Sequence, residues 1–140
     1  MKLFSLIVSC LLLAACSRPV AEQQLLFEDA WVRAMPPGSM MTAGFGRLVN
    51  NSDTAMEISA YSSPQFGDVS LHQTVLEGGL SRMKEVPMLN LAAGSEIELA
   101  PGGYHLMLMQ PTGDLTELVE IHIDLTGGRR FTFELPVERR

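Results

Sequence analysis

The amino-acid sequence predicts an all-β domain, a two-sheet β-sandwich or Greek-key barrel of about nine short strands. Two observations predict this class. Turn-forming clusters of glycine, proline, asparagine and serine recur along the chain, and no window carries the 3.6-residue apolar period of an amphipathic helix. The clusters lie at residues 36–38, 50–53, 62–64, 77–79, 93–94, 101–103 and 126–128.

The last hairpin is the clearest element. Apolar and polar residues alternate over residues 119–125 and again over residues 131–137, with a Gly127-Gly128 turn between them. Two such strands, each with one apolar face, are typical of a half-buried antiparallel pair. His122 lies on the polar face between two carboxylates, so we interpret it as a solvated side chain and not a ligand.

Seven earlier segments show shorter runs of strand-forming residues. We expect strands at residues 25–32, 45–49, 56–61, 68–74, 82–86, 96–99 and 105–109. Trp31, the single tryptophan, is expected to anchor the core. A chain of 140 residues, 46% of them hydrophobic, suits one globular domain.

The N-terminal residues have the pattern of a secretory signal. Lys2 supplies a positive start, residues 3–13 are largely apolar, and two alanines precede Cys16. These residues resemble a bacterial lipobox, which implies cleavage before Cys16, lipidation of its thiol and N-acylation. An ordinary signal cut near Ala15, leaving a protein without an anchor, is the alternative.

We therefore expect three parts: a lipoprotein signal peptide at residues 1–15, the lipidated Cys16 with a polar tether at residues 16–26, and the folded domain at residues 27–137. The expected location is the periplasm, with a lipid anchor in the membrane. Ser17, in place of an aspartate, favours the outer membrane. Cys10 would be removed and Cys16 lipidated, so a disulfide-stapled fold is excluded.

Composition also excludes several functional classes. The net charge of −6 lacks the basic footprint of a nucleic-acid-binding protein. The sequence has no nucleophile motif, glycine-rich phosphate loop, HExxH helix or CxxC pair, so we expect no enzyme.

Histidine and methionine carry the most informative pattern, H-x10-M-x21-H-x-M, formed by His72, Met83, His105 and Met107. His105 and Met107 are two residues apart on an expected strand, so both side chains point to one face, about 7 Å apart. His72 and Met83 lie near the ends of a hairpin-like unit whose turn is at residues 77–79. The pattern predicts one site with two imidazoles and two thioethers.

This donor set favours Cu(I), because thioether sulfur is soft and uncharged, whereas blue copper sites require a thiolate. The alternative is that these methionines are ordinary core residues. For Met109 we favour packing on its strand. Met40 and Met41, after the 36–38 loop, could line the mouth of the site, but we favour loop or edge burial.

The same spacing occurs in the periplasmic copper chaperones called PCu(A)C, which this sequence resembles over residues 27–137. Further resemblance lies in residues 29–34, 36–38, 62–64, 69–72, 78–79 and 101–108. Thr74 and Ser81 stand where many members have methionine, and the chain has no C-terminal tail rich in histidine and methionine.

The resemblance implies a cupredoxin-like Greek-key β-sandwich that binds Cu(I) through His72, Met83, His105 and Met107. We expect one copper per chain, because the tail used for a second site is absent. The implied function is a monomeric metallochaperone. It would deliver copper to the copper-centre subunit of cytochrome oxidase, directly or through a thioredoxin-like assembly factor. A lipid-anchored envelope binding module without copper, or a copper-sequestering protein without delivery, are the alternatives.

Overall fold

A computed structural model describes residues 24–140, and ten strands form the described part of the chain. The predicted signal peptide and Cys16 lie outside the described residues. The strands are β1 Leu25–Arg33, β2 Met41–Asn50, β3 Met56–Ser63, β4 Phe66–Glu77, β5 Leu80–Glu85, β6 Leu89–Leu91, β7 Glu96–Leu99, β8 Tyr104–Pro111, β9 Leu118–Leu125 and β10 Arg130–Glu138. Within residues 24–140, no helix is long and apolar enough to span a bilayer.

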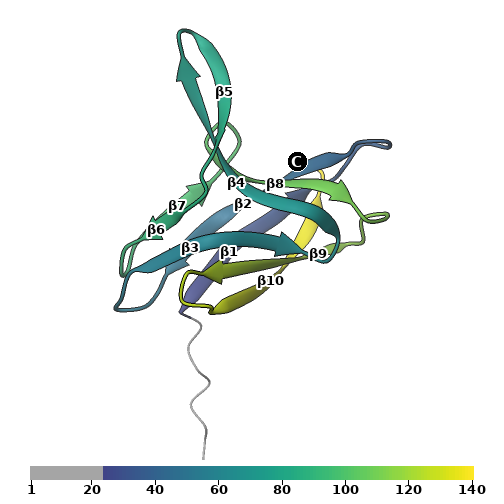
Figure 1. Ribbon diagram of the computed structural model, residues 1–140. Coiled ribbons are helices and arrows are strands. Elements are labelled where there is room, and N and C mark those ends of the chain that lie inside the picture. Colours follow the sequence, from purple (N-terminus) through teal and green to yellow (C-terminus); the bar gives the residue numbers. More distant parts are fainter. Residues whose placement is uncertain (1–23) are drawn as a thin grey trace, which may run out of the picture.

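The strands form one continuous sheet in the order β5-β4-β8-β7-β2-β1-β10-β9-β3-β6. β8 also pairs with β2, and β4 with β3, so the sheet curls back on itself like a barrel (Figure 1). The β4–β5 hairpin projects beyond it, and β1 begins at the opposite end. The all-β prediction is confirmed, whereas the Greek-key sandwich stays a prediction.

The expected strands are present, most with ends shifted by up to three residues, and two differences are larger. β2 begins at Met41, four residues before the expected start, because Met41 and Thr42 pair with Met109 and Leu108 of β8. β6 was not expected: it has only three residues, too few to show alternation, and it forms by pairing with β3.

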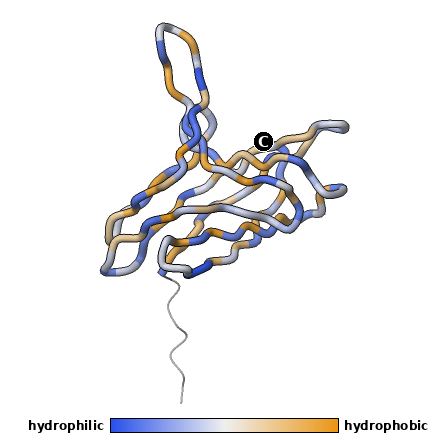
Figure 2. Tube along the Cα trace, viewed as in Figure 1, coloured by the Kyte–Doolittle hydropathy of each residue, from blue (hydrophilic) through white to orange (hydrophobic). Residues whose placement is uncertain are grey.

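Apolar and polar residues alternate along the strands, as the hydropathy colours show (Figure 2). This alternation places the buried apolar side chains on one face of the sheet. Leu71 of β4 and Leu106 and Leu108 of β8 are buried in the central cluster together with apolar residues of β3 and β9. Their neighbours His72, His105 and Met107 consequently point to the opposite face of the sheet.

Trp31 is buried, as expected, but outside this central cluster. Its ring packs against Phe45 with the centroids 4.8 Å apart, and the Arg140 guanidinium lies 4.8 Å from its ring centroid. A β-bulge sets this pair opposite each other. Asp29 and Ala30 of β1 together oppose Gly46 of β2, so that Trp31 pairs with Phe45.

Candidate metal site

The pairing of β4 with β8 brings the two predicted histidine ligands together. His72 lies directly opposite His105, and Ser70 directly opposite Met107. Side chains of directly opposed residues project from the same face of a sheet. The site is thus built on two adjacent strands whose other face is anchored in the core by Leu71 and Leu106.

Met83 comes from the projecting hairpin. It pairs with Thr74 of β4, so it is the diagonal neighbour of His72 and shares its face of the sheet. All of β5 is exposed, and Met83 itself is 62% exposed. Met83 thus lies on the side of the site that is open to solvent.

The two imidazole rings lie 6.0 Å apart between centroids, with an interplanar angle of 27°. His105 is only 4% exposed, and its Nδ1 lies 3.1 Å from the Gly103 carbonyl oxygen. A carbonyl can only accept, so His105 Nδ1 donates and the Nε2 of the neutral ring has a free lone pair. That Nε2 is buried without a hydrogen-bond partner.

His72 also has one imidazole nitrogen in a hydrogen bond and one without a partner. Its Nε2 lies 3.0 Å from the Ser70 hydroxyl, and its Nδ1 is buried without a hydrogen-bond partner. An unpartnered buried polar atom costs about 1–3 kcal/mol, so two of them at paired positions need an explanation. A metal ion that accepts the nitrogen lone pairs would supply one.

The thioethers complete the surroundings. A pocket of about 460 Å³ is lined by Met83, His105 and Met107, with Phe45 and Arg33 beside them. His72 is not among the lining residues, and it reaches the site through its position opposite His105. In the described part of the chain, no three His, Cys, Asp or Glu side chains cluster as a metal site, so this donor set depends on sulfur.

Of the methionines outside the predicted set, Met40 and Met41 differ from expectation. Met40 is 61% and Met41 52% exposed, so the prediction that they are buried is wrong. Met41 lines the pocket with Met83 and Met107, because β2 begins at this residue and pairs with β8. Met109 is half-buried on its strand, as expected.

Ser70 was missed as a site residue. Strand alternation could have indicated it, since it lies two residues before His72 and therefore on the same face.

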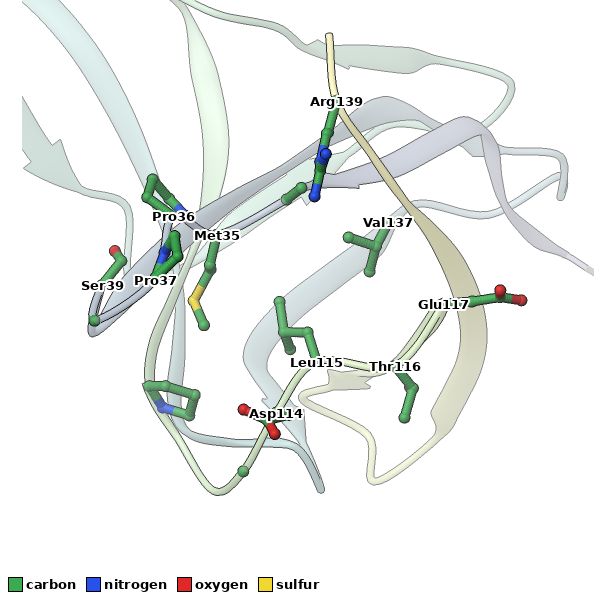
Figure 3. A pocket seen from close by; sticks show the side chains of 14 residues that line it. Met35, Pro36, Pro37, Ser39, Asp114, Leu115, Thr116, Glu117, Val137 and Arg139 are labelled. Carbon is green, nitrogen blue, oxygen red and sulfur yellow. The ribbon is translucent and has the colours of Figure 1, made fainter.

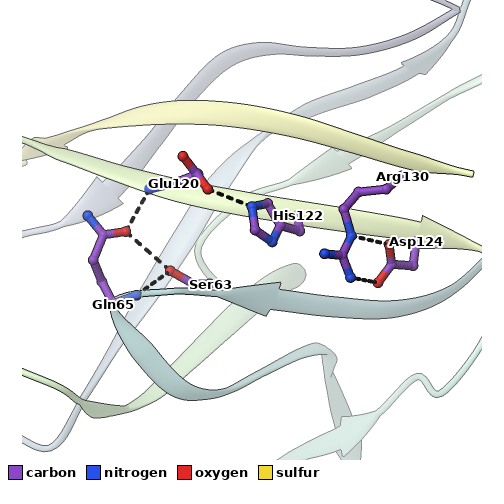
Figure 4. Close-up of polar contacts among 6 residues, drawn as sticks. All are labelled: Ser63, Gln65, Glu120, His122, Asp124 and Arg130. Carbon is purple, nitrogen blue, oxygen red and sulfur yellow. Dashed lines mark hydrogen bonds and ion pairs between the residues drawn. The ribbon is translucent and has the colours of Figure 1, made fainter.

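His122 belongs to a different region. It lies on β9, where its Nε2 is 2.6 Å from a carboxylate oxygen of Glu120, and next to it Asp124 pairs with Arg130 (Figure 4). Gln65 accepts from the Glu120 backbone N–H at 2.9 Å. His122 is on the polar face, as expected, but it is only partly exposed.

A second pocket, of about 620 Å³, lies between the loop after β1, the loop before β9 and the end of β10 (Figure 3). Met35, Leu115 and Val137 form its apolar side, and Asp114, Glu117 and Arg139 are its charged groups. No histidine is among the residues that line it. It therefore lacks the mixed imidazole and thioether set of the first pocket.

The chain matches the protein family described as "Putative lipoprotein LpqE-like" over residues 25–137. It belongs to the LpqE-like family. The LpqE-like chain is 45% identical over 82 residues to "Putative lipoprotein Lxx21020" of Leifsonia xyli, covering 57% of this chain and 48% of that protein. An uncharacterized protein of Rickettsia prowazekii is 29% identical over 107 residues, covering 74% and 59%. The chain thus spans about half the length of these relatives.

Solved structures confirm the resemblance to PCu(A)C proteins. DR1885 of Deinococcus radiodurans in its Cu(I) form is 30% identical, with a TM-score of 0.65 over 89% of this chain and 86% of that one. The copper-bound PCuAC domain from PmoF2 shares the fold, with 20% identity and a TM-score of 0.68 over 84% and 95%. This LpqE-like chain therefore has the fold of the PCuAC domains.

Proposed function

We propose that this LpqE-like protein is an extracytoplasmic metallochaperone that binds one Cu(I) through His72, Met83, His105 and Met107. The observation that carries the proposal is the pair of unpartnered imidazole nitrogens on opposed residues, beside a pocket lined by two of the thioethers. The relation to a protein solved in its Cu(I) form supports the choice of metal.

The spacing of the two imidazole rings is compatible with copper as cargo. Two imidazoles that bind one ion through nitrogen at about 2 Å hold their centroids roughly 5–6 Å apart. The observed 6.0 Å is at the upper end of this range, and Met83 is on an exposed hairpin beside the rings. All four donors are neutral, so they hold Cu(I) without attraction between opposite charges, and an acceptor with thiolates can remove it.

The proposal also includes delivery of the bound Cu(I) to an acceptor protein. The acceptor is the copper-centre subunit of cytochrome oxidase or a thioredoxin-like assembly factor. Among residues 24–140, five of the seven exposed large hydrophobic residues lie on the β4–β5 hairpin or at the start of β2, the two segments that line the pocket with Met83 and Met41. Exposed apolar patches favour protein docking. The five residues are Met40, Met41, Leu76, Leu80 and Met83.

A periplasmic lipid anchor at Cys16, in the outer membrane, belongs to the same proposal. The lipoprotein description of the family supports the anchor. β1 begins at the end of the barrel opposite the β4–β5 hairpin (Figure 1), so an anchored protein would present the site away from its tether.

The test is anaerobic Cu(I) titration of the purified protein against a competing chelator, with His105→Ala and Met107→Leu beside it. We expect one tight equivalent, lost in both variants while their circular dichroism stays that of a folded β protein. Met88→Leu is the control, since Met88 is exposed and does not line the pocket. A wild type that cannot compete for Cu(I) would show that the copper proposal is wrong. Tight binding without transfer to either acceptor would instead indicate sequestration.

A further inference from the structure

Met41 occupies a position that the four-ligand proposal does not use. On the β2–β8 pair, Ala43 lies opposite Met107 and Met41 lies opposite Met109. Met41 is therefore the diagonal neighbour of Met107 on the same face, at a Cα separation of about 7–8 Å, which long side chains can bridge. Methionine is unbranched and flexible, so the Met41 sulfur can approach the Met107 sulfur in the pocket that both residues line.

The side chains that could donate to a metal in this pocket range from buried to exposed. His105 is buried, Met107 is half-buried, and Met83 and Met41 are exposed. These two exposed thioethers come from opposite sides, Met83 from β5 and Met41 from β2. The residues that line the pocket include no carboxylate, and Arg33 is the single charged side chain among them. The exposed Met83 and Met41 form the solvent-facing mouth of the pocket. The soft donors available to a metal ion that enters there are their thioether sulfurs.

We propose that Met41 is a transfer ligand, a fifth copper donor that receives Cu(I) at the mouth when one of the four resting ligands lets go. This inference rests on the proposed function. Four donors already fill the coordination shell of Cu(I), so the Met41 sulfur can bind only in exchange for another ligand. Met41 therefore controls how fast copper enters and leaves, and contributes little to how tightly it is held.

Methyl NMR locates the donors directly. The full-length protein is labelled with ¹³C at its methionine methyl groups and titrated with Ag(I), a stable analogue of Cu(I), in substoichiometric amounts. We expect the Met83 and Met107 methyl signals to shift and that of Met41 to broaden through exchange, with Met40 and Met88 unchanged. If Met83 and Met107 shift and Met41 does not respond, the transfer role is wrong. If none of the three responds, the proposed function itself fails.

Kinetics give the second test. Met41→Leu is compared with Met40→Leu, an exposed neighbour that does not line the pocket. We expect Met41→Leu to slow copper transfer to a chelator several-fold while its Cu(I) affinity stays within about twofold of wild type. Met40→Leu should match the wild type in both. Unchanged transfer in Met41→Leu would overturn the inference. A loss of affinity of about tenfold would also overturn it, because Met41 would then be a resting ligand.

Discussion

His72 and His105 lie directly opposite each other on adjacent antiparallel strands, with their ring centroids 6.0 Å apart. The register of β4 against β8 produces this relationship. A slip of one residue would turn His105 toward the core and leave Leu106 outside. The copper proposal therefore depends on packing, because Leu71, Leu106 and Leu108 hold that register from the other face of the sheet.

Ser70→Ala should weaken copper binding without changing any ligand. The Ser70 hydroxyl lies 3.0 Å from His72 Nε2, and a hydrogen bond there orients the ring. Loss of a group that orients a metal ligand lowers affinity by about 10–100-fold, and we expect the lower end for a neutral hydroxyl. Chelator competition measures it, and Ser70→Thr, which keeps a hydroxyl, should recover most of the affinity. Wild-type affinity in Ser70→Ala would contradict a positioning role for Ser70.

Neighbouring residues of β8 should give opposite phenotypes. Leu106 is fully buried in the core, so Leu106→Ala should lower the free energy of unfolding by about 2–5 kcal/mol. Met107→Leu conserves volume and should cost less than about 1.5 kcal/mol, yet abolish tight Cu(I) binding. Urea denaturation and copper titration measure the two effects. Strong destabilisation by Met107→Leu would favour the alternative that Met107 is a packing residue.

Gly46→Ala should destabilise the fold at the bulge. Gly46 has a φ of +142°, and a Cβ there would lie 2.7 Å from the Cα of Ala30. Both the backbone conformation and this contact disfavour a side chain, so we expect the free energy of unfolding to fall by more than about 2 kcal/mol. Gly127→Ala is the matched control, since a Cβ at Gly127 meets nothing within 4 Å. Equal urea midpoints for the two variants would show that the bulge tolerates a side chain.

Asp124 should contribute to acid sensitivity. Two hydrogen bonds from the Arg130 guanidinium, at 2.7 and 2.9 Å, hold the pKa of Asp124 below its ordinary value of 3.8. A lowered carboxyl pKa in the folded state gives stability that is present above the unfolded pKa. It is lost as the pH falls from 3.8 through the folded pKa. Arg130→Ala should therefore raise the pKa of Asp124 toward its ordinary value. The variant should also lack the loss of folding stability that protonation of Asp124 causes at low pH.

A carboxyl NMR titration measures that shift. Arg129→Ala is the control, because Arg129 bonds to Gln24 and not to Asp124. An unchanged pKa of Asp124 in Arg130→Ala would contradict the assignment.

Alternation in the sequence predicted the strands well wherever they are half-buried. The last hairpin, with His122 on its polar face, follows directly from the period of two along residues 119–125 and 131–137. β6 could not be found in this way, because three residues carry no period and the strand exists only through its pairing with β3. The bulge at Asp29 was equally hidden, since it appears only in the pairing of β1 with β2, where Gly46 closely approaches Ala30.

The sequence by itself determined the all-β class, the donor types and the fact that His105 and Met107 share a face, because these depend only on residue identity and on the local period of a strand. Only the tertiary structure decided which strands are neighbours. That arrangement placed His72 opposite His105, brought Ser70 to His72 and put Met41 at the mouth of the pocket. These relations come from pairings between distant segments, and burial of the common core selects those pairings.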